Sequence, residues 1–245
     1  MDGEHAEMVR LLWGPHPRPA RGPRPTLDLP RIARAGIEIA DAEGLADVSM
    51  QRVAERLGVT KMALYRYVPG KAQLVALMVE AAIGPCPAPA PGHPPGGWRE
   101  QLEEWARQLL ALFLQHSWVL AATVGPRVQG PGELSWLERA VSALDGTGLT
   151  GAERMDAAVL LVGHVRGITQ QAHAAGGPTG NPEAQLGAIL DDLIQSHGDS
   201  YPALTAAFAS AVDSDGRDQA WEFGLQRILD GLSALIDRRA ASRRP

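Results

Sequence analysis

One short stretch of the chain carries the side chains best suited to contacts with nucleic acid. Lys61 and Arg66 are cations, and Tyr65 and Tyr67 add two hydroxyl groups close by. Groups of these types contact the phosphates and the base edges of DNA. Thr60 comes directly before them and can cap a helix. We therefore expect a helix from Lys61 to about Tyr67 whose exposed face binds DNA.

The preceding residues predict a partner helix that would hold this helix in place. Ser49 can cap a helix that ends at Gly58. A helix-turn-helix needs a small residue where its helices touch and a glycine at the turn, and Ala54 and Gly58 meet these needs. The apolar residues available for the corner are Val53, Leu57, Val59 and Leu64. The second helix of such a unit lies in the major groove, with its first residues at the base edges.

The stretch from Val53 to Lys71, V-A-E-R-L-G-V-T-K-M-A-L-Y-R-Y-V-P-G-K, resembles the signature of the tetracycline-repressor (TetR) family. The family core L-Y-x-[HY]-[FV]-x-x-K is matched by Leu64, Tyr65, Tyr67, Val68 and Lys71. The resemblance covers about residues 30–83. A looser similarity to one subgroup extends to the proline- and arginine-rich N-terminus and to the last helix. The resemblance implies a dimeric DNA-binding regulator whose second domain binds an inducer.

The resemblance also implies roles for particular residues. The base-facing start of the recognition helix is occupied by Thr60, Lys61 and Met62, and a base-reading position on the helix before it by Gln51. The positions that contact phosphates are occupied by Ser49, Tyr65, Tyr67 and Lys71, and Arg66 lies on the same exposed face. Two residues depart from the pattern. Ala63 stands where many members have Thr or Ser, and Gln51 stands where the tetracycline repressor has an arginine.

The chemistry of these side chains suits the implied roles. Lys61 can donate to guanine O6 or N7, and Met62 can pack on a thymine methyl group. Tyrosine hydroxyls and Lys71 can fix the register on the backbone without reading sequence. The alternative for the tyrosines is core packing, and Tyr67 at the corner could do both. Arginines that could reach a minor groove are Arg18, Arg21 and Arg24.

The composition fits a soluble regulator. Of the 245 residues, 45% are hydrophobic and 21% are charged, which is ordinary for a globular protein. The single cysteine, Cys86, excludes an intramolecular disulfide and a cysteine metal cluster. The net charge is +4 over residues 10–80 and −6 over residues 81–245, as expected if only the front of the chain contacts phosphates. We expect a cytoplasmic protein without a membrane span, a signal peptide or a cofactor.

The pattern of apolar residues, prolines and glycines predicts an all-α fold with an N-terminal helix-turn-helix domain and a helical ligand-binding and dimerisation domain. We expect a flexible Pro/Arg-rich arm over 1–28 and the DNA-binding domain over 29–84. A Pro/Gly linker follows over 85–97, and the regulatory domain covers 98–245. The linker could instead be a long loop inside one rigid body.

Two motifs that suggest enzymes are better explained as loops. Gly146, Gly148 and Gly151 spell G-x-G-x-x-G, but a dinucleotide site needs a buried strand before them, and a helix is expected there. We predict a helix-to-helix loop in which Thr150 caps the next helix. The cluster of Ser196, His197 and Asp199 follows a helix end, whereas a catalytic triad is assembled in space.

The second domain is expected to enclose a mostly apolar cavity, because a DNA reader alone needs only the first four helices. Its lining is predicted to include Trp105, Trp136, His164 and Gln170, with Trp98, Trp118 and His116 nearby. The alternative is that the tryptophans are plain core and that His164 is a core histidine with a backbone partner.

The last helix has an apolar stripe that predicts a dimer interface through Trp221, Leu225, Ile228 and Leu232, together with the apolar segment 155–171. Leu232 could instead belong to the core of one chain. The favoured hypothesis is therefore a homodimeric repressor, not an enzyme, which a small-molecule inducer releases from a palindromic double-stranded DNA operator. The rival hypothesis is an enzyme or small-molecule carrier with a vestigial front domain.

Overall fold

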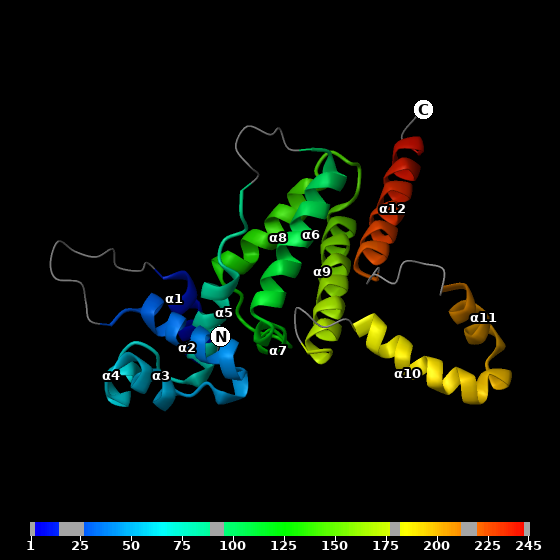
Figure 1. Ribbon diagram of the computed structural model, residues 1–245. Helices are drawn as coiled ribbons and strands as arrows, with labels where there is room; N and C mark the ends of the chain where they lie inside the picture. The colour runs from blue at the N-terminus through cyan, green and yellow to red at the C-terminus, as the bar shows by residue number, and fades with distance from the viewer. Residues whose placement is uncertain (1–2, 15–26, 89–95, 177–181, 212–219, 243–245) are drawn as a thin grey trace. The chain divides into compact units, whose positions relative to one another are not determined.

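The computed structural model describes residues 3–14, 27–88, 96–176, 182–211 and 220–242, and every regular element in these ranges is a helix (Figure 1). The predicted all-α class is confirmed. The chain divides into two compact units, Met1–Ala158 and Val159–Pro245.

The first unit contains eight α-helices in its described residues, and a ninth begins in it. They are α1 (Gly3–Trp13), α2 (Leu29–Glu43), α3 (Met50–Leu57), α4 (Lys61–Tyr65), α5 (Lys71–Ile83), α6 (Trp98–Gln115), α7 (Trp118–Ala122), α8 (Pro131–Ala143) and the first part of α9 (Gly151–Ala174). A short 3-10 helix, η1 (Leu45–Asp47), joins α2 to the segment before α3.

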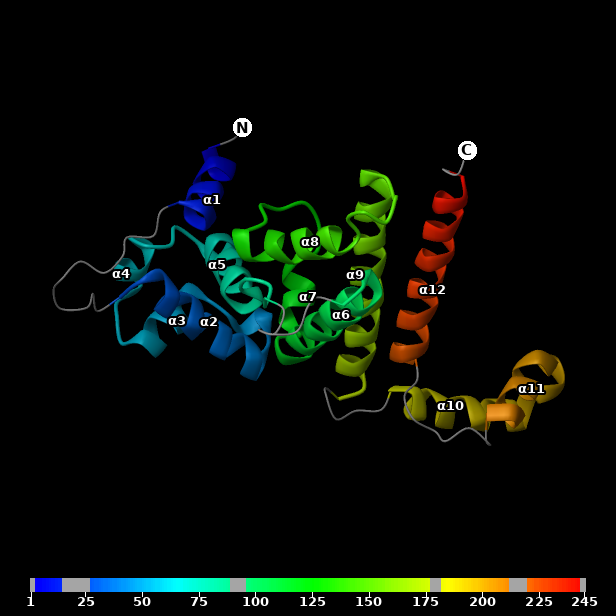
Figure 2. The same ribbon diagram turned by 90° about the horizontal axis from the view of Figure 1, so that it is seen from above.

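The pairing of α2 with α5 forms the core of the front helices (Figure 2). Ile32 and Ile39 of α2 and Leu74 of α5 are almost completely buried. The two helices approach closely at Gly36, because a Cβ atom there would lie 2.6 Å from the Sδ atom of Met78. Their close packing gives α3 and α4 a rigid base.

The N-terminus differs from the predicted flexible arm over 1–28. Residues 3–13 form α1, which packs against α5. Leu12 is buried, and the indole Nε1 of Trp13 donates to the carbonyl oxygen of Gln129 at 2.9 Å. The prediction was wrong for residues 3–14, because the prolines further along say nothing about an apolar segment that finds a distant partner. The arginines Arg18, Arg21 and Arg24 lie outside the described residues.

The end of α5 is tied to α8 by hydrogen bonds from both side chains and backbone. The Oε1 atom of Glu80 accepts from the backbone N–H of Gly132 at 2.8 Å, at the start of α8. The Nε1 atom of Trp136 donates to the carbonyl oxygen of Gly84 at 3.2 Å. A Cβ atom on Gly132 would lie 2.9 Å from Glu80 Oε1, and one on Gly130 would also collide with that carboxylate. Two glycines therefore allow α8 to begin against the side chain of α5.

The loop between α8 and α9 has the predicted character. Gly146 and Gly148 adopt positive φ angles of 74° and 88°. Thr150 Oγ1 accepts from the backbone N–H of Glu153 at 3.2 Å, and Glu153 Oε2 accepts from the N–H of Thr150 at 2.8 Å. This reciprocal pair is a capping box. The loop and the cap are confirmed, and a helix precedes the glycines where a dinucleotide site needs a strand.

The second unit contains the remainder of α9 and the helices that follow. These are α10 (Pro182–His197), the 3-10 helix η2 (Gly198–Ser200), α11 (Pro202–Ala211) and α12 (Ala220–Ala241). His164 of α9 stacks on Trp221 of α12 with ring centroids 5.3 Å apart. His164 Nε2 also lies 3.0 Å from the Trp221 carbonyl oxygen. His197 is the last residue of α10 and is exposed, as expected for the end of a helix.

Candidate nucleic-acid interface

Side-chain caps define both helices of the predicted helix-turn-helix. Ser49 Oγ accepts from the backbone N–H of Arg52 at 3.2 Å and caps α3. Thr60 Oγ1 accepts from the N–H of Ala63 at 3.2 Å and caps α4. Gly58 between them has a φ of 68°, in the left-handed region where a glycine is favoured. The predicted caps and turn are confirmed.

The apolar corner fixes the angle between α3 and α4. Val53, Ala54 and Leu64 are at most 1% exposed. Leu57 and Val59 are half-buried. Because three of these side chains have almost no contact with water, the two helices have a defined packing, and the outer face of α4 has a defined direction.

The outer face of α4 and the turn after it are exposed, as the sequence predicts. Met62 is 76% exposed, and Tyr65 and Tyr67 are 38% and 41% exposed. Lys61 and Arg66 are exposed as well, and Lys61 Nζ lies 5.7 Å from the centre of the Tyr65 ring. The helix ends at Tyr65, slightly before the predicted end. Apolar and cationic groups therefore share one exposed surface, as direct base readout requires.

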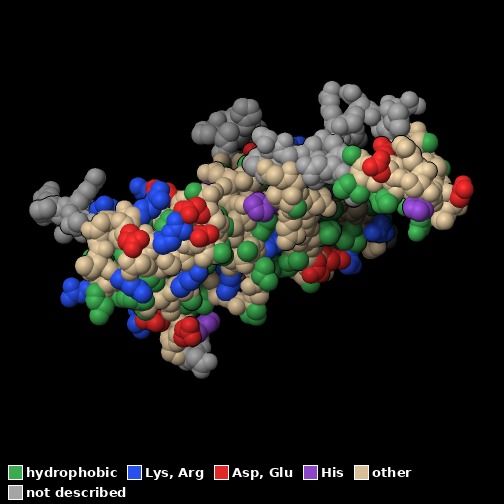
Figure 3. All heavy atoms as spheres, turned by 60° about the horizontal axis from the view of Figure 1, so that its bottom comes forward, with side chains coloured by type: hydrophobic (Ala, Val, Ile, Leu, Met, Phe, Trp, Pro, Cys, Tyr) green, Lys and Arg blue, Asp and Glu red, His purple; other side chains and the backbone are tan. Residues whose placement is uncertain are grey.

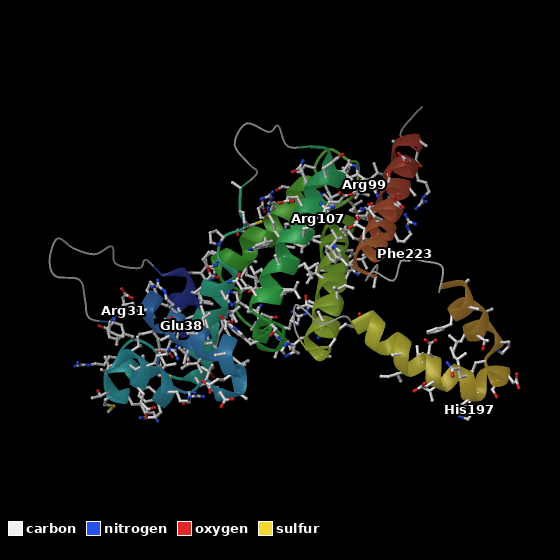
Figure 4. All side chains as sticks on the ribbon, in the orientation of Figure 1. Arg31, Glu38, Arg99, Arg107, His197 and Phe223 are labelled. Carbon is white, nitrogen blue, oxygen red and sulfur yellow. The ribbon has the colours of Figure 1, made fainter. Side chains whose placement is uncertain are left out.

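The arginines of α3 are neutralised by neighbouring carboxylates. Arg52 contacts Glu43 at 2.5 Å and Asp47 at 3.2 Å, and Arg56 contacts Glu38 at 2.8 Å. The hydrogen bond from Arg52 lowers the pKa of Glu43 below its ordinary value of 4.5. Glu38 lies on α2 (labelled in Figure 4). It lines a polar groove of about 220 Å³ between α2 and α3.

The cations of α4 and of the start of α5 lack such partners. In the described part of the chain, no carboxylate lies within 4.0 Å of Lys61, Arg66 or Lys71. Figure 3 shows Lys and Arg side chains over the N-terminal helices, with Asp and Glu side chains among them. Positive charge without a carboxylate partner among the described residues is therefore available to an external polyanion on α4, on the residue after it and at the start of α5.

Gln51 is placed at the first turn of α3 and is exposed, but its amide is engaged. The Nε2 atom donates to Glu55 Oε1 at 2.6 Å, one turn along the helix. The amide also carries a second N–H and a carbonyl oxygen, so Gln51 can contact a base while this hydrogen bond is kept. Glu55 is an acidic group beside the reading surface that the sequence analysis did not single out.

The tryptophans predicted to line a cavity are packed in a core. Trp105 and Trp136 are 1% and 5% exposed, and their rings form an edge-to-face pair with centroids 6.3 Å apart. Trp105 Nε1 donates to the carbonyl oxygen of Trp136 at 2.9 Å, and Trp136 itself donates to Gly84. Gln170 is exposed. The ligand-lining roles of Trp105, Trp136, His164 and Gln170 stay predictions.

The residues predicted for a dimer interface divide into two groups. Leu225 and Leu232 are buried within a single chain, whereas Trp221 and Ile228 are half-buried. Phe223 of the same helix is 65% exposed (labelled in Figure 4), and the sequence did not single it out. The interface stays a prediction.

A polar cluster between α2 and α7 was also missed by the sequence analysis. Asp41 Oδ1 accepts from Trp118 Nε1 at 2.7 Å, and His116 Nδ1 lies 2.8 Å from the same oxygen. His116 and Trp118 were considered as neighbours of the cavity. The signal was hidden because Asp41 and Trp118 are 77 residues apart in the chain.

No helix among the described residues is long and apolar enough to cross a membrane. The same residues contain no group of three or more His, Cys, Asp or Glu side chains that could hold a metal ion.

Two family models match the chain. The model described as bacterial regulatory proteins, tetR family, matches residues 32–78, which include α3 and α4. The model described as tetracyclin repressor-like, C-terminal domain, matches residues 89–236.

The proteins similar to this chain include two from Streptomyces species. The HTH-type transcriptional repressor DrrR1 of Streptomyces coeruleorubidus is 38% identical, over 99% of this chain and 91% of that protein. The crystal structure of apo ActR from Streptomyces coelicolor is 26% identical with a TM-score of 0.71, covering 88% of this chain and 99% of that one. ActR in complex with actinorhodin is 28% identical with a TM-score of 0.68, covering 85% and 96%.

Proposed function

This chain belongs to the tetR family of bacterial transcriptional regulators, and from that premise we propose that it is a homodimeric repressor that a small molecule releases from a palindromic operator. The observation that carries the proposal is the capped α3–α4 pair, whose second helix exposes Lys61 with no carboxylate partner among the described residues. Membership of this family weighs against the rival hypothesis of an enzyme or a carrier.

The DNA contacts that we propose follow from this geometry. Lys61 and Met62 read base edges from the start of α4, and Gln51 reads from α3 with the amide groups that its bond to Glu55 leaves available. Thr60 uses an oxygen lone pair for its cap, which leaves its hydroxyl hydrogen able to donate to DNA. The proposed phosphate contacts are made by Ser49, Tyr65, Arg66, Tyr67 and Lys71.

We propose that α9 and α12 pair with the same helices of a second copy. Val159 and Leu160 of α9 and Phe223 of α12 are each more than half exposed, at 63%, 53% and 65%. Exposed apolar side chains in such number indicate an interaction surface. In an isologous dimer, each copy would bury these side chains against the same surface of the other copy. Phe223→Glu should yield a folded monomer in sedimentation that has lost operator binding. A folded dimer of that variant would move the interface elsewhere.

The proposed regulatory domain, residues 98–245, follows the linker of residues 85–97 in the chain and binds the inducer. A structural relative was solved with actinorhodin, which supports a small-molecule ligand here. An inducer that moves Trp136 would break its hydrogen bond to Gly84 at the end of α5, the helix that begins with Lys71. Ligand binding and phosphate contact would then be coupled through one helix.

Selection of bound fragments from genomic DNA tests the proposal. The purified protein should enrich fragments that share a palindrome, and titration with that duplex should give specific binding that a scrambled duplex does not compete away. Lys61→Ala should enrich the fragments less selectively. A protein that retains no fragment over background would support the carrier or enzyme instead.

A screen of apolar and amphipathic compounds of drug size tests the inducer. A compound that binds should raise the melting temperature of the free protein and weaken its complex with the selected duplex. Linkage then requires the duplex to weaken the compound by the same factor. Compounds that bind without changing the affinity for the duplex would contradict the model of ligand-induced release.

A further inference from the structure

We infer that Asp41 is a positioning residue that fixes the DNA-reading helices against α7 and thereby sets the half-site spacing that the dimer accepts. The inference rests on the proposed function. The side chain of Asp41 belongs to α2 and is bonded to α7. It is not part of the exposed face of α4.

The geometry places two groups of one segment on a single carboxylate oxygen. Trp118 Nε1 lies 2.7 Å and His116 Nδ1 lies 2.8 Å from Asp41 Oδ1. The rings of His116 and Trp118 are 6.3 Å apart at an interplanar angle of 64°, so each approaches the oxygen from a different direction. Two contacts from different directions hold this oxygen against the segment of residues 116–118 more firmly than a single hydrogen bond would.

Burial makes this contact well defined. Trp118 is 5% exposed, and the side chains of His116 and Asp41 are 12% and 33% exposed. The neighbouring α7 residues Val119 and Leu120 are buried as well, and α7 packs against α5 and η1. A charge-assisted hydrogen bond that is partly shielded from water is stronger than an exposed one.

The position of Asp41 in α2 points to the same role. It lies in the last turn of the helix, where the macrodipole disfavours a negative charge, and this turn contains no basic residue. The carboxylate is therefore unfavourable for α2 alone, and its donors come from a segment 75 and 77 residues away. Asp41 therefore does not stabilise α2 itself, and its contribution is to hold α2 against the segment of residues 116–118.

The path from Asp41 to the reading surface is short. Three residues after Asp41, Gly44 leaves the helix with a φ of 94°, and η1 then leads to Ser49, the cap of α3. A change in the orientation of α2 relative to α7 therefore moves α3 and α4 together. In a dimer that reads two half-sites one turn of DNA apart, such a movement alters the distance between the two recognition helices.

The test compares duplexes that carry the selected palindrome with its own spacing and with one base pair inserted or deleted between the half-sites. The wild-type protein should prefer its own spacing. Asp41→Ala should bind the native duplex roughly 2- to 30-fold more weakly, the range for substitutions that act on coupling between sites. It should also discriminate less between spacings, and its salt dependence should stay unchanged because the substitution removes no group that binds phosphate.

Matched variants separate positioning from plain stability. Asp41→Asn keeps an oxygen acceptor for Trp118 and should lie between the wild type and Asp41→Ala. Trp118→Phe removes the N–H donor while it keeps an aromatic ring, and its effect should not add to that of Asp41→Ala. Lys71→Ala should weaken binding equally at every spacing. Arg107→Ala, which changes an exposed arginine of α6, should change neither affinity nor spacing preference.

Each outcome is decisive. A wild-type protein that binds no selected duplex contradicts the proposed function itself. A wild-type protein that prefers one spacing, with an Asp41→Ala variant that keeps the same affinity and preference, overturns this inference alone. If Asp41→Ala does not fold, Trp118→Phe decides, because unchanged discrimination between spacings in that folded variant overturns the inference equally.

Discussion

The caps of the front helices and the buried indoles of the helices behind them join residues at very different separations along the chain. In α2, α3 and α4, each side-chain cap joins residues three positions apart, as Ser49 does with Arg52. In α6, α7 and α8, the indole N–H groups donate to acceptors 31, 77 and 52 residues away. The reader is thus built from local signals, whereas its attachment to the rest of the unit depends on distant ones.

The buried tryptophans of α6, α7 and α8 join elements that are distant in the chain. Large aromatic side chains in a regulatory domain suggested cavity walls, but those of Trp105, Trp118 and Trp136 are nearly completely buried. Each donates its N–H group to a specific oxygen. A buried indole satisfies its polar group in this way, so it fastens one element to another besides filling space.

The largest expected effect separates the two regions by stability. Trp105→Ala should lower the free energy of unfolding by about 3–5 kcal/mol, because it leaves a cavity in the core. Lys61→Ala, on an exposed face, should change it by less than about 0.5 kcal/mol. Urea denaturation followed by circular dichroism measures both. Similar losses from the two variants would erase the distinction between core and reading surface.

Trp136→Phe tests the distant hydrogen bond itself. The substitution keeps an aromatic ring but leaves the carbonyl oxygen of Gly84 without its donor. The expected loss is about 1–3 kcal/mol, the cost of a partly buried carbonyl oxygen that loses its donor plus that of a smaller ring. Trp98→Phe is a suitable comparison, because Trp98 is only half-buried at the start of α6. An equal, small loss from both variants would show that the bond to Gly84 contributes little.

Lys61 and Lys71 sharpen the comparison within the reader. Lys61→Ala should cost about 1–3 kcal/mol of binding free energy on the preferred duplex and relax its preference at one or two base pairs of each half-site. Lys71→Ala should weaken binding to all sequences and reduce the salt slope by about 0.9 for each phosphate that the variant no longer neutralises. Titrations over a series of salt concentrations give both quantities. Equal loss of specificity from the two variants would overturn the assignment.

The smallest effect concerns the ion pair that neutralises Arg52. Its hydrogen bond lowers the pKa of Glu43 in the folded protein, so this pair stabilises the fold above the ordinary pKa of 4.5 and stops doing so as the pH falls through the lowered value. Arg52→Gln should raise the pKa of Glu43 and make stability less sensitive to acid in that range. NMR titration of the carboxyl carbon checks the first effect. An unchanged pKa would show that Arg52 is not its cause.

The reach of each interaction also explains what the sequence could predict. The helical class, the cap residues and the left-handed Gly58 follow from neighbours within a turn or two. The N-terminal helix α1 was missed, because its stability depends on packing against α5 and on the bond from Trp13 to Gln129, 116 residues away. Asp41 gave no signal for the same reason. The exposed face of α4 was predictable, because Thr60 marks the start of the helix and Leu64 is the apolar residue of α4 that the corner needs.

The glycines at the start of α8 set a limit on how this protein can be recombined with its relatives. An engineer who grafts this reader onto another regulatory domain would naturally cut between residues 85 and 97. That cut separates Glu80 from Gly130 and Gly132, which leave room for its carboxylate and supply its N–H donor. A functional chimera must therefore carry a glycine at the position equivalent to Gly132, where a Cβ atom would also lie 2.9 Å from the backbone of Gly84. At the position equivalent to Gly130 it needs either a glycine or a smaller residue in place of Glu80.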